Sequence, residues 1–399
     1  MFSDMKDKLR IAIVGGGLGG LTAGILLEKL GYNYTIYEQA PEISRIGAGI
    51  NLYHNTTRIF KALGLLDRML AAGMKVESWL NREWDTGRIY FAQLQQEWEQ
   101  QFGAPHMTLH RGDLQSIMAS AVSKHRLQFG RHVTGLDDRH GMIRITFKDG
   151  STTDADIVIG ADGVNSIVRE ILLGPELPTY SGFVAYRAIF PRKLLGNYTL
   201  DSDGCKYWCD DRHWAEEDRH FIIYYLTSAR DEIYFVTGSP DPNWEGQLPV
   251  NVEMAEIKKH YEGFHESVQR VIDACPKASK WPLLVRKPLP LWSRGRIVLL
   301  GDACHPMKPH MGQGAGMAIE DAAVLVRCID AAEGDYAGAF QLYMANRIGR
   351  TSKVQDISQK NIWMRYPTDP TWCYGYDALT VPLVSAAQQP AKTQQAALV

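Results

Sequence analysis

Short runs of apolar residues, separated by glycine, organise the first 40 positions of the chain into a strand–helix–strand pattern. Residues 11–14 form an apolar run suited to a buried parallel strand. Glycines follow, and apolar residues then recur at helical spacing from Leu18 to Leu30. Gly31 ends that predicted helix, and residues 34–37 read as a second strand. The pattern therefore predicts one βαβ unit.

Helical and strand-like patterns alternate along the rest of the chain. Apolar residues at helical spacing predict helices over 56–69, 113–123, 251–274, from about 316, and 336–360. Asp113 follows a glycine and is expected to cap its helix. Strands are predicted at 155–159, 221–226, 232–237 and 296–300, with a hairpin at Asp149-Gly150. Because residues 178–245 read as antiparallel strands, we expect an antiparallel sheet inserted into an α/β fold.

The composition narrows the class of protein. A chain of 399 residues that is 45% hydrophobic can bury a sizeable core, and its net charge of −2 provides no basic field for nucleic acid or an anionic membrane. No window approaches the roughly 20 apolar residues of a membrane-spanning helix, and residues 1–10 lack the apolar stretch of a signal peptide. We therefore expect neither nucleic acid nor a membrane as a partner.

The six cysteines are scattered, which is typical of reduced thiols in a cytoplasmic enzyme and not of a disulfide framework. Cys205 and Cys209 are the only close pair. They have no second cysteine or histidine pair at ligand spacing, so no metal site is expected.

Glycines after the first predicted strand fit the dinucleotide-binding pattern G-x-G-x-x-G. Gly15 permits the tight turn, Gly17 lets the backbone approach a pyrophosphate, and Gly20 lets the helix pack on the strand. A pyrophosphate would lie at the N-terminus of that helix. Glu38 closes the second strand, where its carboxylate can accept hydrogen bonds from a ribose. The pattern predicts a dinucleotide but does not separate FAD from NAD, since both contain ADP.

Two later stretches separate these cofactors. In the first stretch, residues 155–166, the predicted strand is followed by Asp162-Gly163. In the second, residues 296–316, the predicted strand is followed by Gly301-Asp302 and then by glycines at the start of a predicted helix. With three such stretches in this order, the chain resembles the class A flavoprotein aromatic hydroxylases, the group that includes p-hydroxybenzoate and salicylate hydroxylases. The resemblance covers the chain to about residue 380.

The resemblance implies an α/β fold: a Rossmann-like FAD-binding domain of the GR2 type with an inserted antiparallel β-sheet substrate domain and C-terminal helices. The FAD-binding domain is expected at 1–77, 103–177 and 288–360, the substrate domain at 78–102 and 178–287, and a C-terminal extension at 361–399. The end of this extension, after Pro382, is rich in Gln and Ala, and we expect it to be frayed.

The same resemblance implies how FAD is held. Asp302 would accept a hydrogen bond from the ribityl chain, and backbone N–H groups near Gly314 and Ala315 would face the pyrimidine end of the flavin. Asp162 would support FAD and the approach of NAD(P)H, and Arg111 would touch the phosphates or ribose. Read structurally, Asp162-Gly163 is a turn and Arg111 a surface cation. The full set of expected cofactor-binding residues is Gly15, Gly17, Leu18, Gly20, Glu38, Gln39, Arg45, Arg111, Val133, Asp162, Asp302, Pro309, Gly314 and Ala315.

The reductant is expected to be NADH, with NADPH possible. The chain offers no second strand–glycine–helix unit, and in class A enzymes the nicotinamide cofactor has no domain of its own. Oxygen would reach an electron-rich ring from O2 through a flavin C4a-hydroperoxide. Such chemistry needs a base or relay near a ring hydroxyl, an anchor for any carboxylate, and exclusion of water.

Further stretches resemble one subgroup, the 6-hydroxynicotinate 3-monooxygenases and related hydroxypyridine-carboxylate monooxygenases. They are 47–50, 109–114, 180–187, 289–295, 301–310 and 370–377. The implied reaction is the decarboxylative hydroxylation of 6-hydroxynicotinate to 2,5-dihydroxypyridine. The partners would be this aromatic acid and O2, and the enzyme would be a monomer or a homodimer.

Carried over to this chain, Tyr224 and His220 would orient and deprotonate the substrate hydroxyl, Cys205 would line the pocket, and His310 would contact the substrate near the flavin. Strand alternation places His220 and Tyr224 on one face. Tyr224 could instead be an ordinary strand tyrosine and Cys205 a small buried hydrophobe. His213 could replace His220, because Asp-Arg-His occurs at both 211–213 and 218–220.

One departure affects the expected substrate. The subgroup places a histidine directly after Gly-Ala-Gly-Ile, where this chain has Asn51, which cannot act as a base at neutral pH. Tyr53 and His54 follow closely and could compensate. The alternatives are 6-hydroxypicolinate or another hydroxypyridine acid, or a salicylate-type benzenoid acid. A flavin halogenase would carry a Trp-x-Trp-x-Ile-Pro motif, which is absent, and a non-enzymatic FAD-binding protein would not need His, Tyr and Cys beside the flavin.

Overall fold

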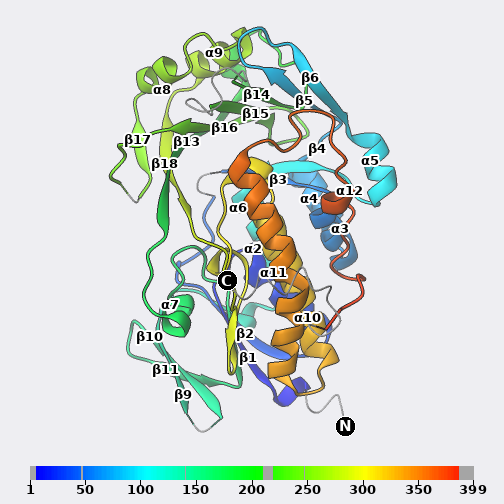
Figure 1. The fold of residues 1–399 in the computed structure, drawn as a ribbon, viewed down its shortest axis with the longest axis vertical. Helices are drawn as coiled ribbons and strands as arrows, with labels where there is room; N and C mark the ends of the chain where they lie inside the picture. The colour runs from blue at the N-terminus through cyan, green and yellow to red at the C-terminus, as the bar shows by residue number, and fades with distance from the viewer. Residues whose placement is uncertain (1–5, 46–47, 140, 210–218, 247, 386–399) are drawn as a thin grey trace.

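A parallel sheet forms the centre of the lower half of the molecule in Figure 1. The computed structural model describes residues 6–45, 48–139, 141–209, 219–246 and 248–385. The sheet has the order β19-β20-β12-β1-β2-β8, and all neighbouring pairs except β19–β20 are parallel. Its strands are β1 (Arg10–Val14), β2 (Asn33–Tyr37), β8 (Leu127–Gln128), β12 (Ile157–Gly160), β19 (Ser293–Arg294) and β20 (Ile297–Leu299).

Helices cover this sheet because its strands are apolar on both faces and need cover on each. The long helix α10 packs against α2 and α11, and α11 runs diagonally up the molecule towards the second sheet (Figure 1). The helices of this half are α2 (Leu18–Lys29), α3 (His54–Leu63), α4 (Leu66–Ala72), α6 (Arg111–Ala119), α7 (Ile167–Leu173), α10 (Gly314–Ala331) and α11 (Tyr336–Lys360).

An eight-stranded sheet forms the upper half, in the order β17-β18-β13-β16-β15-β14-β5-β6. Its neighbours are antiparallel except β14 and β5. Its strands are β5 (Ser78–Glu83), β6 (Ile89–Leu94), β13 (Thr179–Pro191), β14 (Gly204–Trp208), β15 (His220–Tyr225), β16 (Glu232–Pro240), β17 (Val250–Val252) and β18 (Ala278–Val285). The helices α8 (Met254–His260) and α9 (Glu266–Ala274) pack on its outer face through Ile257, Val268 and Val271.

Two smaller sheets complete the fold. One three-stranded sheet contains β3 (Gly49–Leu52), β7 (Met107–His110) and β4 (Met74–Lys75), and another, at the lower end of the molecule in Figure 1, contains β9 (Val133–Arg139), β10 (Met142–Phe147) and β11 (Thr152–Ala155). The predicted hairpin at Asp149-Gly150 joins β10 to β11 and is confirmed. The remaining helices are α5 (Gln95–Phe102), α12 (Thr371–Tyr374) and the 3-10 turns η1 (Lys124–Arg126), η2 (Arg192–Leu195), η4 (Gly301–Ala303) and η5 (Pro309–Met311).

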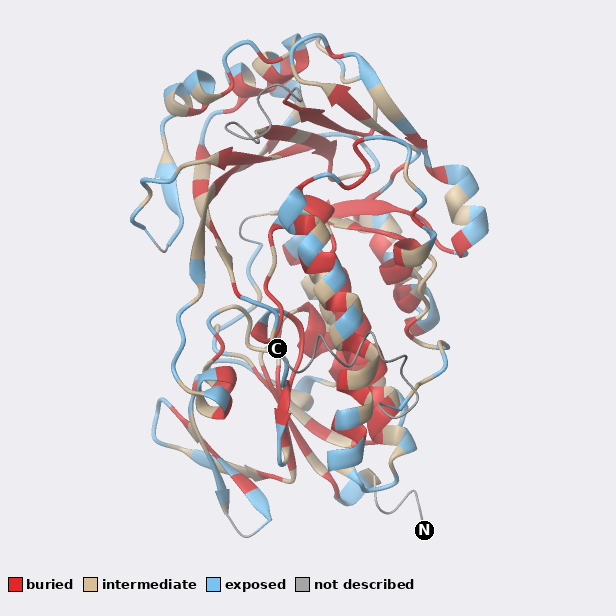
Figure 2. Cartoon of the chain, viewed as in Figure 1, coloured by how far each residue is buried: buried red, intermediate tan, exposed pale blue. Residues whose placement is uncertain are grey.

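Buried residues lie along the central strands of both sheets and on the inward faces of α10 and α11 (Figure 2). One apolar cluster fills the space between the parallel sheet and its helices, and a second lies between the eight-stranded sheet and α8 and α9. Among the described residues, none of the helices is both long and apolar enough to cross a membrane.

Three predicted helices differ from the observed ones. The helix expected at 56–69 is divided into α3 and α4 at Gly64, whose φ of 76° ends α3 in the left-handed conformation. The helix expected at 251–274 is divided into α8 and α9 around Gly263, with a φ of 81°. Asp113 does not cap α6; the Nδ1 of His110 accepts the hydrogen bond from the N–H of Gly112 instead.

Candidate active site

The predicted nucleotide-binding residues meet at one edge of the parallel sheet. Gly15 follows β1, Glu38 follows β2, Asp162 follows β12, and Asp302 follows β20. These four strands are neighbours in the sheet and run in the same direction. Their carboxyl ends therefore lie side by side, which is where open α/β sheets bind ligands. Three stretches far apart in the sequence thus form one edge.

Two glycines of the first turn, Gly15 and Gly20, leave no room for a side chain. A Cβ at Gly15 would lie 2.4 Å from the oxygen of Ala161, and the φ of Gly15 is 109°. A Cβ at Gly20 would lie 2.0 Å from the oxygen of Gly15. Gly17 differs, since a Cβ there would meet no atom within 4 Å. The turn thus leaves an open cradle beside Gly17, at the start of α2, where a pyrophosphate would fit.

Three cavities run from this cradle to the eight-stranded sheet. The first, of about 500 Å³, lies between Gly17, Glu38 and Asp162. The second, of about 170 Å³, shares Gly17, Ala161 and Gly163 with the first. The third, of about 300 Å³, shares Arg111, Asp302, Gly314 and Ala315 with the second. This continuous, elongated path fits an extended dinucleotide that ends in a flat ring system.

Acidic residues of the first cavity are already oriented by the protein. Glu38 accepts hydrogen bonds from the backbone N–H groups of Gly16, at 2.7 Å, and Ala40, at 2.8 Å. Asp162 accepts from the hydroxyl of Ser166 at 2.5 Å and from the N–H of Val168 at 3.1 Å. Burial nevertheless raises the pKa of the Asp162 carboxyl.

Arg111 and Asp302 stand where the second and third cavities join. Both side chains have accessible surface, and both line the second and third cavities. Desolvation in this setting lowers the pKa of Arg111 and raises the pKa of Asp302, while each charge opposes the shift of the other. The pair places one cation and one carboxyl beside the middle of the path.

The other expected cofactor residues are placed as follows. Gln39 and Val133 line the first cavity, Leu18 the second, and Pro309 the third. Arg45 lines none of these three cavities. It is exposed, and its guanidinium donates to Asp113 and Glu232, each at 3.0 Å, so its expected contact with FAD is not supported by its position.

The eight-stranded sheet forms a wall of the third cavity, and its side chains lie in rows across the strands. One row contains Trp79, Gly204, Tyr224 and Tyr234, which are paired across β5, β14, β15 and β16. A Cβ at Gly204 would lie 2.3 Å from the Trp79 ring, so the glycine lets this indole lie over β14 towards Tyr224, with the two rings 5.8 Å apart. Burial, followed by Tyr234 and Tyr53, raises the pKa of Tyr224, which keeps its hydroxyl protonated.

The next row brings a residue that the sequence analysis missed. Lys206 of β14 is paired with Asn81 on one side and Ile222 on the other, and all three line the third cavity. Lys206 is buried, and its ammonium donates to the Oδ1 of Asn361 at 3.0 Å. The register between β14 and β15 would have identified Lys206, because a residue paired with Ile222 lies on the same face of the sheet.

His220 lies on the same face as Ile222 and Tyr224, as predicted, but one row beyond the cavity, opposite Trp208. It is not among the lining residues. Its Nδ1 receives the amide of Asn361 at 3.2 Å, and its ring meets that of His310 edge to face at 5.0 Å. Burial, Lys206 and His310 lower the pKa of His220 well below its usual range. His213, the alternative to His220, lies outside the described residues.

His310 lines the cavity, as the sequence predicted. Its Nδ1 lies 3.0 Å from the backbone oxygen of Ser358, and its Nε2 is buried without a partner among the described residues. Burial, followed by the charges of Lys206 and Lys308, lowers the pKa of His310 well below its usual range. The imidazole is therefore neutral at physiological pH.

The prediction that Cys205 lines the pocket is wrong. Successive side chains of a strand point to opposite faces, and Lys206 occupies the cavity face of β14. Cys205 instead packs with Tyr207 and Ile223 in the apolar cluster beneath α8 and α9. Burial raises the pKa of the Cys205 thiol to about 12, so this sulfur is an inert part of the core.

Asn51 lines the cavity from β3, and Tyr53 lines it too. His54 turns away, with its Nδ1 at 2.7 Å from the oxygen of Ala104, so it does not replace the missing histidine. His106 approaches instead. Its Nε2 lies 3.1 Å from the Oδ1 of Asn51. Nothing in the local sequence pairs these residues, which meet because β3 and β7 are neighbours.

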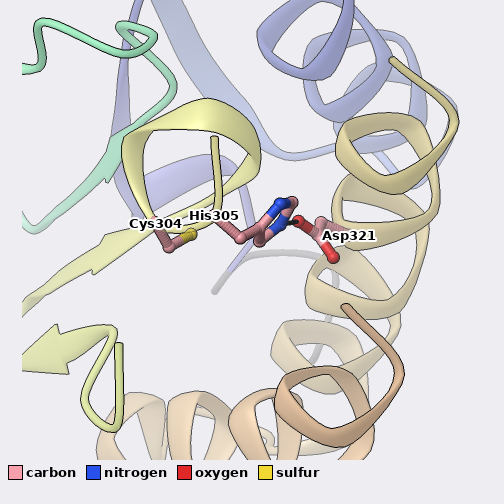
Figure 3. Close-up of side chains that lie close together, drawn as sticks. All are labelled: Cys304, His305 and Asp321. Carbon is pink, nitrogen blue, oxygen red and sulfur yellow. Dashed lines mark hydrogen bonds and ion pairs between the residues drawn. The ribbon is translucent and has the colours of Figure 1, made fainter. Parts of the chain in front are cut away.

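Beneath the loop after β20, Cys304, His305 and Asp321 lie close together (Figure 3). The Nε2 of His305 is 2.5 Å from Asp321, and the other oxygen of Asp321 accepts from the Nε of Arg347 at 2.7 Å. Because a guanidinium already neutralises this carboxylate, a second cation would meet repulsion. The cluster is best described as a buried ion-pair network that fixes the loop before His310.

Comparisons with known proteins agree with this geometry. The family model described as "FAD binding domain" matches residues 8–352. The chain is 47% identical to the 6-hydroxynicotinate 3-monooxygenase of Bordetella bronchiseptica, over 95% of this chain and 98% of that protein. It is 46% identical to the enzyme of that name from Pseudomonas fluorescens, over 95% and 98%. The fold is similar to that of Klebsiella pneumoniae HpxO complexed with FAD and uric acid, with a TM-score of 0.78, 24% identity, and coverage of 91% of this chain and 90% of that one.

Proposed function

The chain belongs to the FAD binding domain family and is an FAD-dependent aromatic-ring monooxygenase, and from this premise we propose that it hydroxylates a hydroxypyridine carboxylate with loss of CO2. The substrate proposed first is 6-hydroxynicotinate, which would give 2,5-dihydroxypyridine. The observation that carries the proposal is the third cavity, which continues the dinucleotide path and is lined by a tyrosine, a neutral histidine and cationic side chains.

The residues along the path fit FAD. The cradle beside Gly17 and the N-terminus of α2 would hold the pyrophosphate, and Glu38 would hold the adenosine ribose. Arg111 and Asp302 would face the central part of the cofactor, and the N-terminus of α10 at Gly314 would face the flavin. When bound and reduced, FAD supplies the activation of O2 that the side chains cannot provide.

The protein's own contribution in this cavity would be to bind an acid. Arg187, Lys206 and Lys308 line the cavity, and their positive charges favour an anionic ligand in a site of low dielectric constant. A carboxylate bound by Lys206 and Lys308, whose charges act on His310, would lie beside that ring. The wall of Trp79, Tyr224 and Tyr234 offers flat apolar surfaces that would hold an aromatic ring and exclude water.

Tyr224 and His310 would handle the proton of the ring hydroxyl. A protonated Tyr224 can donate to the substrate oxygen or pass a proton on, and the bare Nε2 of His310 can accept one. Removal of the hydroxyl proton pushes electrons into the ring. Oxygen then bonds to the carbon that carries the carboxylate, the C–C bond to the carboxylate breaks, and its electron pair returns to the ring as CO2 leaves.

We propose NADH as the reductant and O2 as the source of the oxygen atom. We also propose that the enzyme is cytoplasmic and is a monomer or a homodimer. Gln39, Val133, Leu18 and Pro309 complete the proposed cofactor contacts. One NADH and one O2 would be consumed for each CO2 and dihydroxypyridine formed.

A substrate panel tests this function directly. Purified holoenzyme is mixed with NADH and, in turn, 6-hydroxynicotinate, 6-hydroxypicolinate and salicylate, and NADH oxidation, CO2 release and ring product are measured together. The proposal expects 6-hydroxynicotinate to accelerate NADH oxidation with equal amounts of CO2 and 2,5-dihydroxypyridine. Product from salicylate alone, or ring hydroxylation without CO2, would reject it.

6-Hydroxypicolinate is the second candidate, and Asn51 is the observation that favours it. This residue stands where the resembled subgroup carries histidine, and it lines the cavity. A different ring-substitution pattern would place the hydroxyl against a different wall, so the same panel distinguishes the two acids.

A further inference from the structure

Asn51 and His106 form one unit at the cavity wall. Asn51 belongs to β3 and faces the cavity, while His106 immediately precedes β7, the strand paired with β3. The Nε2 of His106 lies 3.1 Å from the Oδ1 of Asn51. Only Asn51 of the two lines the cavity, so any influence of His106 on a ligand would pass through this amide.

His106 is held rigidly and without contact with bulk water. Its side chain has no exposed surface, and its ring stacks on Tyr53 at 4.4 Å with an angle of 16° between the planes. Trp79, at 5.6 Å, packs against another part of the ring. Burial, followed by the charge of His54, lowers the pKa of His106 well below its usual range, so the ring is neutral.

The tautomer of His106 follows from its hydrogen-bond partner, the Oδ1 of Asn51. An amide oxygen only accepts hydrogen bonds, so a neutral His106 bonded to Oδ1 must have its proton on Nε2. Its Nδ1 is then a bare acceptor, and it has no partner among the described residues. With Oδ1 engaged by the histidine, the two hydrogens on Nδ2 are the part of the Asn51 amide left for other partners.

We propose that His106 is a positioning residue that fixes the Asn51 carboxamide so that its Nδ2 donates a hydrogen bond to an anionic or carbonyl oxygen on the substrate ring. The inference rests on the proposed function. It narrows the substrate class to rings whose oxygen is an acceptor when bound, either deprotonated or in the pyridone form, with C=O in place of C–OH. A hydroxypyridine reaches the pyridone form by moving its proton to the ring nitrogen, whereas a phenol must lose its proton to present such an oxygen.

Asn51 thus differs chemically from the histidine of the resembled subgroup. It stabilises the oxygen after its proton has left, and it takes no proton itself. Proton removal would be left to Tyr224 and His310.

Ligand binding to oxidised holoenzyme tests the inference. Binding of 6-hydroxynicotinate and of nicotinate, which lacks the ring oxygen, is followed by the change in the flavin absorption spectrum. Asn51→Ala is expected to weaken 6-hydroxynicotinate about tenfold and to leave nicotinate within about twofold, because only the first ligand loses a hydrogen bond. Asn51→Asp is expected to weaken it further, because a carboxylate keeps the His106 bond but repels the ligand oxygen.

Variants of His106 separate positioning from simple packing. His106→Phe keeps the ring stacked on Tyr53 but releases the amide, and it should reproduce most of the Asn51→Ala effect on 6-hydroxynicotinate alone. His106→Gln restores an N–H donor and should recover binding. His54→Phe is the matched control, since His54 is equally buried but its Nδ1 hydrogen-bonds the backbone oxygen of Ala104. It should affect both ligands equally.

The outcomes are distinct for the two proposals. Equal loss of both ligands in His106→Phe would show a packing role and overturn the inference. Stronger 6-hydroxynicotinate binding in Asn51→Asp would show that the amide is an acceptor towards the ligand, which also overturns it. Wild-type enzyme that binds neither pyridine acid contradicts the proposed function itself, whereas binding without the predicted difference contradicts only the inference. Bound FAD and the melting temperature of each variant report folding.

Discussion

The Nδ1 of His310 hydrogen-bonds the backbone oxygen of Ser358 at 3.0 Å, and this contact fixes the chemistry of the opposite nitrogen. A carbonyl oxygen only accepts, so Nδ1 carries the proton of the neutral ring. The Nε2 of His310 is therefore unprotonated, in a ring that lines the cavity. The last turns of α11 thus set which nitrogen carries the proton in a histidine of the loop after β20.

Replacement of His310 tests its proposed role as the base. His310→Phe should lower kcat by about 100-fold, the lower end of typical general-base contributions, with retained FAD binding. Because burial and the neighbouring lysines hold the pKa of His310 well below its usual range, wild-type kcat should not fall when the pH decreases through about 6.5. The measurement is kcat against pH. An acid limb centred near 6.5 that disappears in His310→Gln would contradict the neutral ring.

Lys206 is predicted to anchor the substrate carboxylate. Lys206→Met keeps most of the side-chain volume but removes the charge, and it should raise KM for the pyridine acid by about 10- to 100-fold with a smaller change in kcat. Cys205→Ala is the matched control, because it alters the adjacent residue on the opposite face of β14. That variant should keep KM and kcat within about twofold. A larger effect from Cys205→Ala than from Lys206→Met would reverse the assignment of the two faces.

The difference between Cys205 and Lys206 shows how far the sequence could predict the site. The strand–helix–strand pattern predicts the glycine turn and Glu38, whereas the roles of Asp162 and Asp302 follow from the family resemblance. All of them come after parallel strands, whose carboxyl ends meet at one edge. The cavity wall depends on which face each strand of the antiparallel sheet presents. The sequence predicts that His220, Ile222 and Tyr224 share one face of their strand. Which residues of β14 share that face depends on the register between the two strands, and the structure pairs Lys206 with Ile222.

Other parts of the site had no local signal. His106 meets Asn51 only because β3 and β7 pair. Asn361 reaches Lys206 and His220 from the C-terminal end of α11, and the predicted helix over 336–360 gave no indication of these contacts. The division of the predicted helices at Gly64 and Gly263 reflects a related limit. Apolar periodicity continues across both breaks, while the left-handed backbone at each glycine ends the hydrogen-bonded turns.

Gly17 and Gly20 are expected to respond differently to alanine. Gly20→Ala would place a Cβ 2.0 Å from the oxygen of Gly15 and should disrupt packing of α2 on the sheet. Gly17→Ala meets no protein atom, so the chain should fold, but the methyl group would occupy the pyrophosphate cradle. Circular dichroism and an FAD titration separate the two. Native FAD affinity in folded Gly17→Ala would mean that the phosphates lie elsewhere.

Buried neutral histidines should make the protein unstable in mild acid. In the unfolded chain, histidines take up protons below about pH 6.5, whereas burial lowers the pKa of His220 and His310 far below that value in the fold. The unfolded state therefore binds more protons, and the free energy of unfolding falls with decreasing pH by up to about 1.4 kcal/mol per pH unit for each histidine. Above about pH 7.5 both states are neutral and the effect vanishes.

Urea unfolding between pH 5.5 and 7.5, with FAD at saturation, measures this slope. His220→Asn should reduce the slope by the contribution of one proton, whatever its effect on stability at pH 7.5. A slope that is unchanged in His220→Asn would show that this histidine is protonated in the fold or titrates alike in both states.

Asn361 ends α11 in the left-handed conformation, with a φ of 49°, and its amide joins Lys206 to His220. A pair of variants separates the role of Asn361 in ending the helix from the role of its amide in holding Lys206. Asn361→Gly removes the amide but relieves the backbone, whereas Asn361→Ala removes the amide and keeps a strain of about 1 kcal/mol. Asn361→Gly should therefore be the more stable of the two, by about that amount in urea unfolding, while both raise KM for the pyridine acid to the same extent because Lys206 is no longer held. If Asn361→Gly instead retained the wild-type KM, the position of Lys206 would not depend on this amide, and the residue would serve only to end the helix.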